Sequence, residues 1–389
     1  MKTLLSCLAF VLAAGAADAQ TPDPPPSPPS TQAEPKPTLR ERLSKPDQAG
    51  GLHFTEHFGV AFGGIKQGSG IALGPAFSNT FSDGGFVQLK AVFSIKKFWV
   101  MQARYDTRRF WSDRAILISR LRWYDAPELS LYRLGQDSPN ARTEYSERRT
   151  DGTTLLMFRP VTNVRLNAGF GVERYATGAE DLPAKEGPGA LPETPALPGL
   201  GTHPWFAHTF ASIAHDTRLS TDYSRRGHNA EIGLHDYHDW KSGQDSFRRL
   251  EMSLQQLIPT YAERGVIDVG ARTWFTDGKD QGSVPFFLMP TLGGGDLLRA
   301  FPSYRFRDRN ALLLKAEYRW AVHKMLDVAG IYEAGKVAPR VADLDFDDMA
   351  HSYGVGIRAH SDKASLFRAD LAHGREGWGF RVGFTAGGS

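Results

Sequence analysis

A run of acidic, aromatic and imidazole side chains is the part of the sequence that could most directly do chemistry. It reads His235-Asp236-Tyr237-His238-Asp239, and histidine beside carboxylates can bind a metal ion or transfer protons. In an extended strand, neighbouring side chains point to opposite faces. His235 and Asp239 therefore share a face with Tyr237, whereas Asp236 and His238 lie on the other. Because the four do not converge, the pattern favours the polar end of a strand over a metal or acid–base site.

Other signatures of catalysis are missing from the sequence. No serine lies in a Gly-x-Ser-x-Gly setting, the turn that carries the nucleophile of many hydrolases. Gly293-Gly294-Gly295 is not followed by Lys and Ser or Thr, as a phosphate-binding loop would be. The single cysteine, Cys7, lies in the leader described below, which excludes disulfides, thiolate metal sites and cysteine nucleophiles. We therefore predict that the protein is not an enzyme and holds no cofactor or metal.

The first 51 residues read as a targeting segment followed by a linker. A lysine, an apolar stretch and the small-residue site Ala17-Asp18-Ala19 predict a secretory signal peptide over residues 1–19. Residues 20–51 form a Pro-rich linker, because eight of the 24 prolines lie between positions 22 and 37 and favour extended, exposed chain. Residues 38–50 are predicted to be either a short amphipathic helix or plain linker.

The remainder, residues 52–389, alternates apolar and polar residues with a period of two, which indicates half-buried strands. Residues 87–95 read Val-Gln-Leu-Lys-Ala-Val-Phe-Ser-Ile, and the same alternation returns at 312–320, 365–371 and 378–384. The polar faces carry full charges of both signs, as in a wet lumen, and tryptophans gather near strand ends, where a membrane barrel has its aromatic girdles. Lys+Arg 46 against Asp+Glu 43 leaves a net charge of +3, which argues against a nucleic-acid binder.

We predict an all-β fold, a 16-stranded antiparallel transmembrane β-barrel. The long connections, 124–140, 176–204, 275–308 and 336–348, all follow odd-numbered strands, as expected if both ends of the barrel face the periplasm. The predicted strands are 56–66, 68–77, 84–95, 98–108, 113–123, 141–159, 162–175, 205–217, 228–239, 245–257, 263–274, 309–320, 324–335, 349–360, 364–372 and 377–386.

Several segments resemble one family of barrels. The segment LGGGDLLRAF at 292–301, followed by RFRD at 305–308 and AEYR at 316–319, is similar to the hallmark loop of BamA/TamA-type outer-membrane barrels, the bacterial surface antigen family. HDTR at 215–218, GVGIR at 354–358 and RAD at 368–370 resemble further segments of that family. The resemblance covers about residues 52–386 and predicts a barrel domain without the POTRA repeats that precede it in that family.

The resemblance implies a loop before the twelfth strand that folds into the lumen. The family's motif is Arg-Gly-Phe/Tyr, and its arginine pairs with acidic residues on the next two strands. Arg299 takes the arginine position here, and Ala300 replaces the usual glycine before Phe301. Glu317 and Glu333 occupy the acidic positions and, by strand parity, face the lumen. The predicted site therefore consists of the loop motif and its lumen partners: Gly294, Gly295, Arg299, Ala300, Phe301, Glu317 and Glu333.

These features lead to a functional hypothesis. We expect an integral protein of the outer membrane of a Gram-negative bacterium, inserted by the cell's barrel-assembly machinery and surrounded by outer-membrane lipids. It would act in outer-membrane biogenesis or in protein or lipid handling, through a periplasmic or membrane protein partner that docks on residues 20–50. The alternative is a passive channel or porin. A hydrolase is the weakest hypothesis, because no nucleophile and base converge.

Overall fold

The computed structural model describes residues 51–63, 65–178, 197–221, 223–261, 264–278, 284–361 and 365–384, without the side chains of 51–53 and 384. The predicted leader and nearly all of the predicted linker therefore lie outside the described residues. No helix in the described part of the chain is long and apolar enough to span a membrane.

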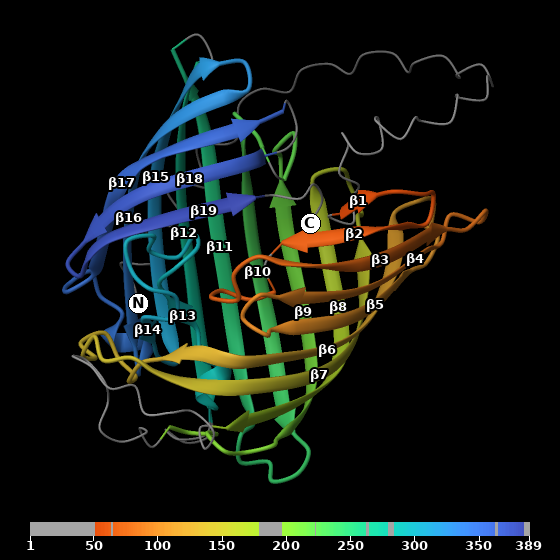
Figure 1. Cartoon of the computed structure of the whole chain (residues 1–389), viewed down its shortest axis with the longest axis horizontal. Helices are drawn as coiled ribbons and strands as arrows, with labels where there is room; N and C mark the ends of the chain where they lie inside the picture. The colour runs from red at the N-terminus through yellow and green to blue at the C-terminus, as the bar shows by residue number, and fades with distance from the viewer. Residues whose placement is uncertain are drawn as a thin grey trace. The chain divides into compact units, whose positions relative to one another are not determined.

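Sixteen long strands, joined edge to edge, form one antiparallel sheet (Figure 1). Residue pairs connect these strands in chain order, and the three-residue strand β1 (Gly51–His53) pairs with the free edge of β2. The long strands are β2 (Phe58–Gly63), β3 (Ala72–Thr80), β4 (Phe86–Ser94), β5 (Trp99–Asp106), β6 (Ala115–Leu131), β7 (Thr143–Phe158), β8 (Val164–Gly178), β9 (Trp205–Asp216), β10 (Gly227–Asp239), β11 (Phe247–Thr260), β12 (Gly265–Gly278), β15 (Asn310–His323), β16 (Leu326–Ala338), β17 (Ala350–His360), β18 (Ser365–Gly374) and β19 (Gly377–Phe384).

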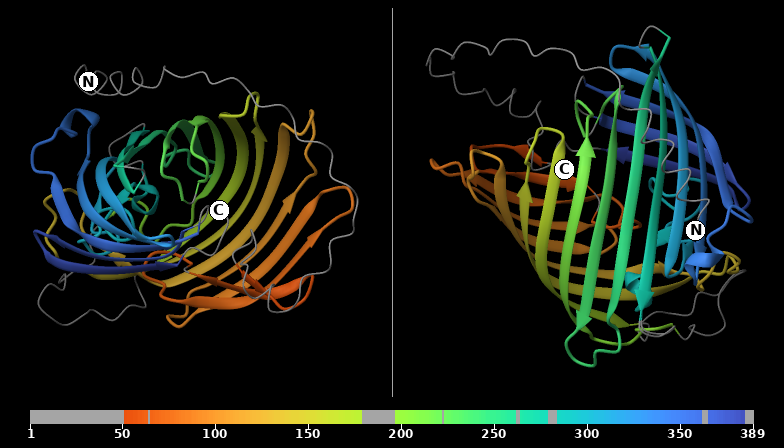
Figure 2. Two further views of the ribbon diagram at one scale, coloured as in Figure 1. Left: turned by 90° about the horizontal axis from the view of Figure 1, so that it is seen from above. Right: turned by 180° about the vertical axis from the view of Figure 1, so that it is seen from behind.

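The sheet curves round a central space, so that its last strands come back toward its first strands (Figure 2). The predicted fold class is thus confirmed, and all of the sixteen strands except β6 lie within a few residues of their predicted ranges. Four ranges need correction. β8, β12 and β16 extend to Gly178, Gly278 and Ala338, into the predicted loops 176–204, 275–308 and 336–348, and β6 extends to Leu131, well beyond the predicted end at residue 123.

The extension of β6 was missed because a β-bulge interrupts its alternation. The register with β7 shifts between Ala126 and Leu129, where the strand holds extra residues. Beyond the bulge, Leu129 and Leu131 are buried in a cluster with Phe286 of the inner loop. The C-terminal part of β6, beyond the bulge, is therefore stabilised by contacts with the inner loop, and a period-two pattern in the sequence does not reveal these contacts.

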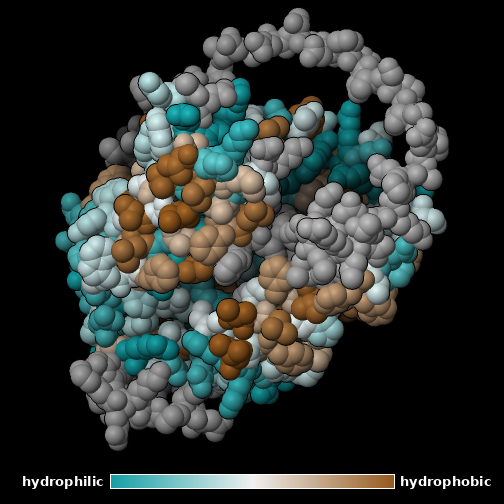
Figure 3. Space-filling model, turned by 45° about the horizontal axis from the view of Figure 1, so that its top comes forward, coloured by the Kyte–Doolittle hydropathy of each residue, from teal (hydrophilic) through white to brown (hydrophobic). Residues whose placement is uncertain are grey.

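The two faces of the sheet differ as predicted from the alternation. Outward side chains are large, apolar and exposed, as at Leu121 and Phe380. The face in Figure 3 shows such side chains gathered in two hydrophobic patches. Inward side chains include many charged groups that are buried nonetheless, such as Asp268, Glu333 and Asp370. Buried charges are costly unless they are paired, so the inner face must hold a network of ion pairs.

Candidate functional site: the loop inside the barrel

The connection between β12 and β15 contributes buried apolar side chains to three hydrophobic clusters. Its described part, residues 284–309, contains the 3-10 turn η2 (Phe286–Leu288) and the paired short strands β13 (Thr291–Leu292) and β14 (Phe306–Arg307). Gly294 and Gly295, both in the predicted motif, have φ angles of +77° and +56°. That left-handed conformation favours glycine, and it turns the chain so that the Gly294 amide donates to the Phe301 carbonyl at 3.0 Å.

The side chain of Arg299 extends from this turn and is surrounded by carboxylates. This side chain is 7% exposed. Its Nη1 lies 3.1 Å from Glu333 Oε1, and its Nη2 lies 3.3 Å from Glu317 Oε2. Its own backbone amide also donates to Glu333 Oε2 at 2.7 Å. The structure thus brings together the arginine and the two glutamates that the sequence singled out.

Two further residues complete what we call the Arg299 cluster: Arg299, Glu317, Glu333, Arg358 and Asp370. Asp370 Oδ2 lies 3.2 Å from Arg299 Nε, and its other oxygen lies 2.5 Å from Arg358 Nη1. Arg358 also binds Glu317, with Nη2 2.9 Å from Oε2. The sequence prediction missed both as site residues. Their inward parity on β17 and β18 was a usable signal, since Arg358 and Asp370 lie in segments already noted for their family resemblance.

Ala300 and Phe301 fasten the loop to the inner face of the last strands. The Ala300 amide donates to Ser352 Oγ on β17 at 3.1 Å. Phe301 is fully buried and packs on Phe306, with ring centroids 5.1 Å apart. Gly379 of β19 makes room for this contact, because a Cβ there would lie 2.5 Å from the Arg299 carbonyl oxygen. The chain therefore passes directly over β19 where a larger residue could not be accommodated.

The same loop is also bound to the opposite wall. Phe286 packs edge-on against Tyr145 of β7, with centroids 4.8 Å apart, and Phe287 lies 4.9 Å from Tyr175 of β8. Arg249 of β11 donates to the carbonyl oxygen of Leu288. Since the Arg299 cluster holds the other end of the loop on β15–β18, the loop crosses the lumen and is anchored on both sides.

Arg305 adds a third anchor that sequence reasoning did not single out. Its side chain is 2% exposed. Its Nη2 lies 2.7 Å from Glu376 in the β18–β19 turn, and its Nη1 donates to Ser138 Oγ at 2.9 Å. Ser138 belongs to the connection between β6 and β7, so Arg305 links the loop to two strand connections at once.

The histidine run on β10 has the parity that the sequence predicted, but three of its members, His235, Asp236 and Tyr237, contact side chains on other strands. His235 lies 3.0 Å from His208 of β9, and His208 Nδ1 lies 2.8 Å from Glu173 Oε1 of β8. Tyr237 stacks on His208, with centroids 4.0 Å apart. His208 and Glu173 were not predicted as site residues. Among the described residues, no group of three or more His, Cys, Asp or Glu side chains has the arrangement of a metal site.

Comparison with solved structures identifies the fold. BamA from Haemophilus ducreyi lacking POTRA domains 1–3 superposes with a TM-score of 0.62 at 13% identity, over 85% of this chain and 70% of that chain. CdiB from Escherichia coli gives 0.54 at 11% identity, over 84% and 62%, and CdiB from Acinetobacter baumannii gives 0.52 at 9%, over 84% and 59%. The chain thus spans about three fifths of the length of the CdiB chains.

These likenesses confirm the predicted resemblance at the level of the fold: the chain is built like the barrels of BamA and CdiB. No protein-family model matches the sequence. No curated protein matches it either.

Proposed function

We propose that this protein is an integral barrel of the Gram-negative outer membrane that serves membrane biogenesis, or protein or lipid handling, without catalysis of its own. One observation carries the proposal over the passive channel: the loop of residues 284–309 is anchored on both walls of the lumen. Its anchors on one side are buried ion pairs and on the other side aromatic contacts. A loop held this way obstructs the lumen, as suits a barrel that acts through its wall and its partners.

The first strand supports a role for the wall. β2 spans only Phe58–Gly63, is the shortest of the sixteen long strands, and contains two glycines, which weaken a strand. Its edge is paired with β1, over only three residue pairs. In the proposed mechanism the seam between the ends of the sheet is its weakest junction, where a client strand gains access by pairing with the edge of β2.

The partner in this proposal is a periplasmic or membrane protein that docks on residues 20–50. These residues lie outside the described part of the chain, and the proposal rests on their Pro-rich composition and on their position before the first strand. The barrel itself would be inserted by the cell's barrel-assembly machinery.

Capture of partners from envelope membranes tests this proposal. The full chain and a variant without residues 20–50 are each purified after in-cell cross-linking, and their bound proteins are compared. We expect a defined envelope protein with the full chain and its loss from the shortened variant. Identical capture by both, with the shortened chain still folded as a heat-modifiable barrel, would contradict docking on residues 20–50.

A passive channel remains the second candidate, and one observation favours it. The inward faces of β4 and β6 carry Lys90 and Arg120, which have no ion pair among the described residues, as in a hydrated pore that attracts anions. Single-channel recording in planar bilayers separates the two candidates. Small or no conductance supports the obstructed barrel, whereas a large, steady and anion-selective current supports the channel.

A further inference from the structure

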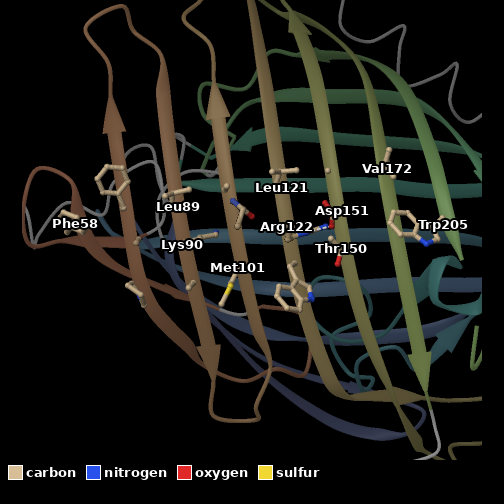
Figure 4. A pocket seen from close by; sticks show the side chains of 18 residues that line it. Phe58, Leu89, Lys90, Met101, Leu121, Arg122, Thr150, Asp151, Val172 and Trp205 are labelled. Atoms are coloured by element: carbon tan, nitrogen blue, oxygen red, sulfur yellow. Dashed lines mark hydrogen bonds and ion pairs between the residues drawn. The ribbon is translucent and has the colours of Figure 1, made fainter. Parts of the chain in front are cut away.

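A hollow of about 720 Å³ lies on the outer face of the wall formed by β2–β9 (Figure 4). This volume is in the range of pockets that hold small organic ligands. The lining is overwhelmingly apolar, and it includes the large side chains of Phe58, Leu89, Met101, Leu121 and Trp123.

Two neighbouring rows of cross-strand partners build the hollow. Paired residues on adjacent strands point to the same face, so that each row can be followed across the wall. The first row is Phe58, Phe77, Leu89, Ala103, Leu121, Gly152 and Val172, and the second is Ala91, Met101, Trp123, Thr150, Arg174 and Trp205.

The position of the hollow on the outside follows from the residues between these rows. Arg122 lies between Leu121 and Trp123 in the sequence and points the other way, to bind Asp151 with Nε 3.0 Å from Oδ1. Asp151 is buried inside the barrel, where it also binds Arg149. Figure 4 shows this ion pair between the strands, with Leu121 directed away from it.

Small residues among large ones make the wall concave here. Ala91, Ala103 and Gly152 are the small residues of the lining, and the larger side chains of Leu89, Leu121, Met101 and Trp123 stand beside them on the same face. The hollow is therefore long, apolar and open along the wall, a shape that fits an acyl chain.

A positively charged side chain, that of Arg174, lies at one end of the hollow. Arg174 lies between the lining residues Thr150 and Trp205 in the second row, is exposed, and has its guanidinium 5.4 Å from the centroid of the Trp205 ring. No carboxylate pairs with it among the described residues. The neighbouring outward arginine, Arg148, differs in this respect, because its Nε lies 3.0 Å from Asp125 Oδ2.

Tryptophans mark the level of Arg174 relative to a membrane. Trp123 and Trp205 belong to the same row, and Trp99 packs edge-on against Trp123 with centroids 4.7 Å apart. Outward tryptophans of membrane barrels concentrate at the interface, at the level of the lipid headgroups. A guanidinium at that level lies where lipid phosphates lie, and its fork of N–H donors suits a phosphate.

We propose that this wall binds one phosphate-bearing lipid, with an acyl chain in the hollow over Ala91, Ala103 and Gly152 and the phosphate on Arg174. The site assumes a membrane-embedded barrel, as proposed above, but requires no particular partner protein. Failure of partner capture and failure of lipid binding are therefore separate results.

Native mass spectrometry of the detergent-solubilised full chain tests the site. Three probes are titrated: phosphatidylglycerol, diacylglycerol without a phosphate, and inorganic phosphate without a chain. We expect one tightly held phosphatidylglycerol, weaker diacylglycerol binding, and no displacement of phosphatidylglycerol by inorganic phosphate.

Two variants test the phosphate contact and the acyl-chain contact separately. Arg174→Gln should weaken phosphatidylglycerol binding about tenfold or more, to the level of diacylglycerol, since a hydrogen bond to a charged group contributes about 1.5–3 kcal/mol. Ala103→Phe fills the hollow and should weaken both lipids. The matched controls are Arg248→Gln, an exposed outward arginine on β11, and Ala211→Phe, an exposed outward alanine on β9. Both controls should bind as the wild type does.

Several results would overturn the site. Equal phosphatidylglycerol binding by Arg174→Gln and Arg248→Gln would mean that Arg174 does not bind the phosphate. Equal binding by Ala103→Phe and Ala211→Phe would mean that lipid merely surrounds the barrel. A dimer in lipid-free detergent that Ala103→Phe dissociates would assign the hollow to a second copy of the chain.

Discussion

Strands β2–β5 and strands β15–β18 belong to the same sheet, yet they hold their inward-facing charges differently. β15–β18 are 14, 13, 11 and 10 residues long, and four of their inward charges join Arg299 of the loop in the closed Arg299 cluster. β2–β5 are 6, 9, 9 and 8 residues long. On that side Arg104 of β5 lies directly opposite Arg120 of β6, so that two like charges face each other.

The buried apolar contacts show the same contrast. The β15–β18 wall shares a core with the loop, including Leu292, Leu298, Phe301 and Phe306. The buried cluster of β2–β4 consists of three alanines and Val92. We infer that the last strands form the rigid wall of the barrel and that the first strands form the wall that opens more easily, because local opening follows from few buried contacts.

Removing the guanidinium of Arg299 is expected to have the largest effect. In Arg299→Ala, Glu317 and Asp370 keep only their ion pairs with Arg358 among the described residues, and Glu333 keeps none in that part of the chain. Breaking a buried ion pair costs about 3–5 kcal/mol. The free energy of unfolding, measured by denaturant titration in micelles with heat-modifiable gel mobility as the readout, should fall by that amount.

On the wall formed by β2–β5, the variant to compare with Arg299→Ala is Arg104→Ala. It removes one ion pair, between Arg104 and Asp106, and the Arg104 side chain is 37% exposed. Such pairs contribute about 1 kcal/mol or less. Equal losses in the two variants would mean that the walls do not differ in the way described.

A smaller loss is expected from crowding the loop against β19. Gly379→Ala places a Cβ 2.5 Å from the Arg299 carbonyl oxygen and 2.9 Å from Ala300 Cα. Overpacking of this kind costs about 1–3 kcal/mol, and the displaced loop should be cut faster by protease. In Gly330→Ala on β16 the new Cβ meets no atom within 4 Å, so that this control should resist protease as the wild type does. Faster cleavage of the control would show that the effect is not specific to the loop contact.

The smallest expected effect is a gain in stability. Arg120→Gln removes the repulsion with Arg104 on the paired strand. Like charges directly opposite each other destabilise a sheet by about 0.2–1 kcal/mol, so that this variant should be slightly more stable than the wild type. The gain should shrink at high salt, which screens the repulsion. A loss of stability at low salt would reveal a counter-charge for Arg120.

The positions of the strands could be predicted from the sequence because a barrel wall has two chemically different sides. Alternation along residues 87–95 and 312–320 marks each strand, whatever its neighbours are. The prediction failed where a strand residue packs against a distant part of the chain and not against the membrane or the lumen. Leu129 and Leu131 are such residues, because they pack on Phe286.

Part of the candidate site could likewise be predicted from the sequence, and part of it could not. Family resemblance pointed to Arg299, Glu317 and Glu333, and strand parity agreed for the glutamates. Strand parity marks Arg358 and Asp370 as inward-facing, but it does not say which charges they pair with. Neither signal gives the anchoring of Phe286 on Tyr145, because this contact joins segments far apart in the chain.

The sequence by itself determined which residues face outward, which face inward and where the chain turns, since these follow from the period of the strand and from glycine's conformational freedom. Only the tertiary structure decided which strands pair in which register. That register places Arg299 among three carboxylates, sets Arg104 against Arg120 and aligns Ala103 with Gly152 across the outer wall. Cross-strand neighbours depend on the pairing of distant segments, and no local pattern encodes that pairing.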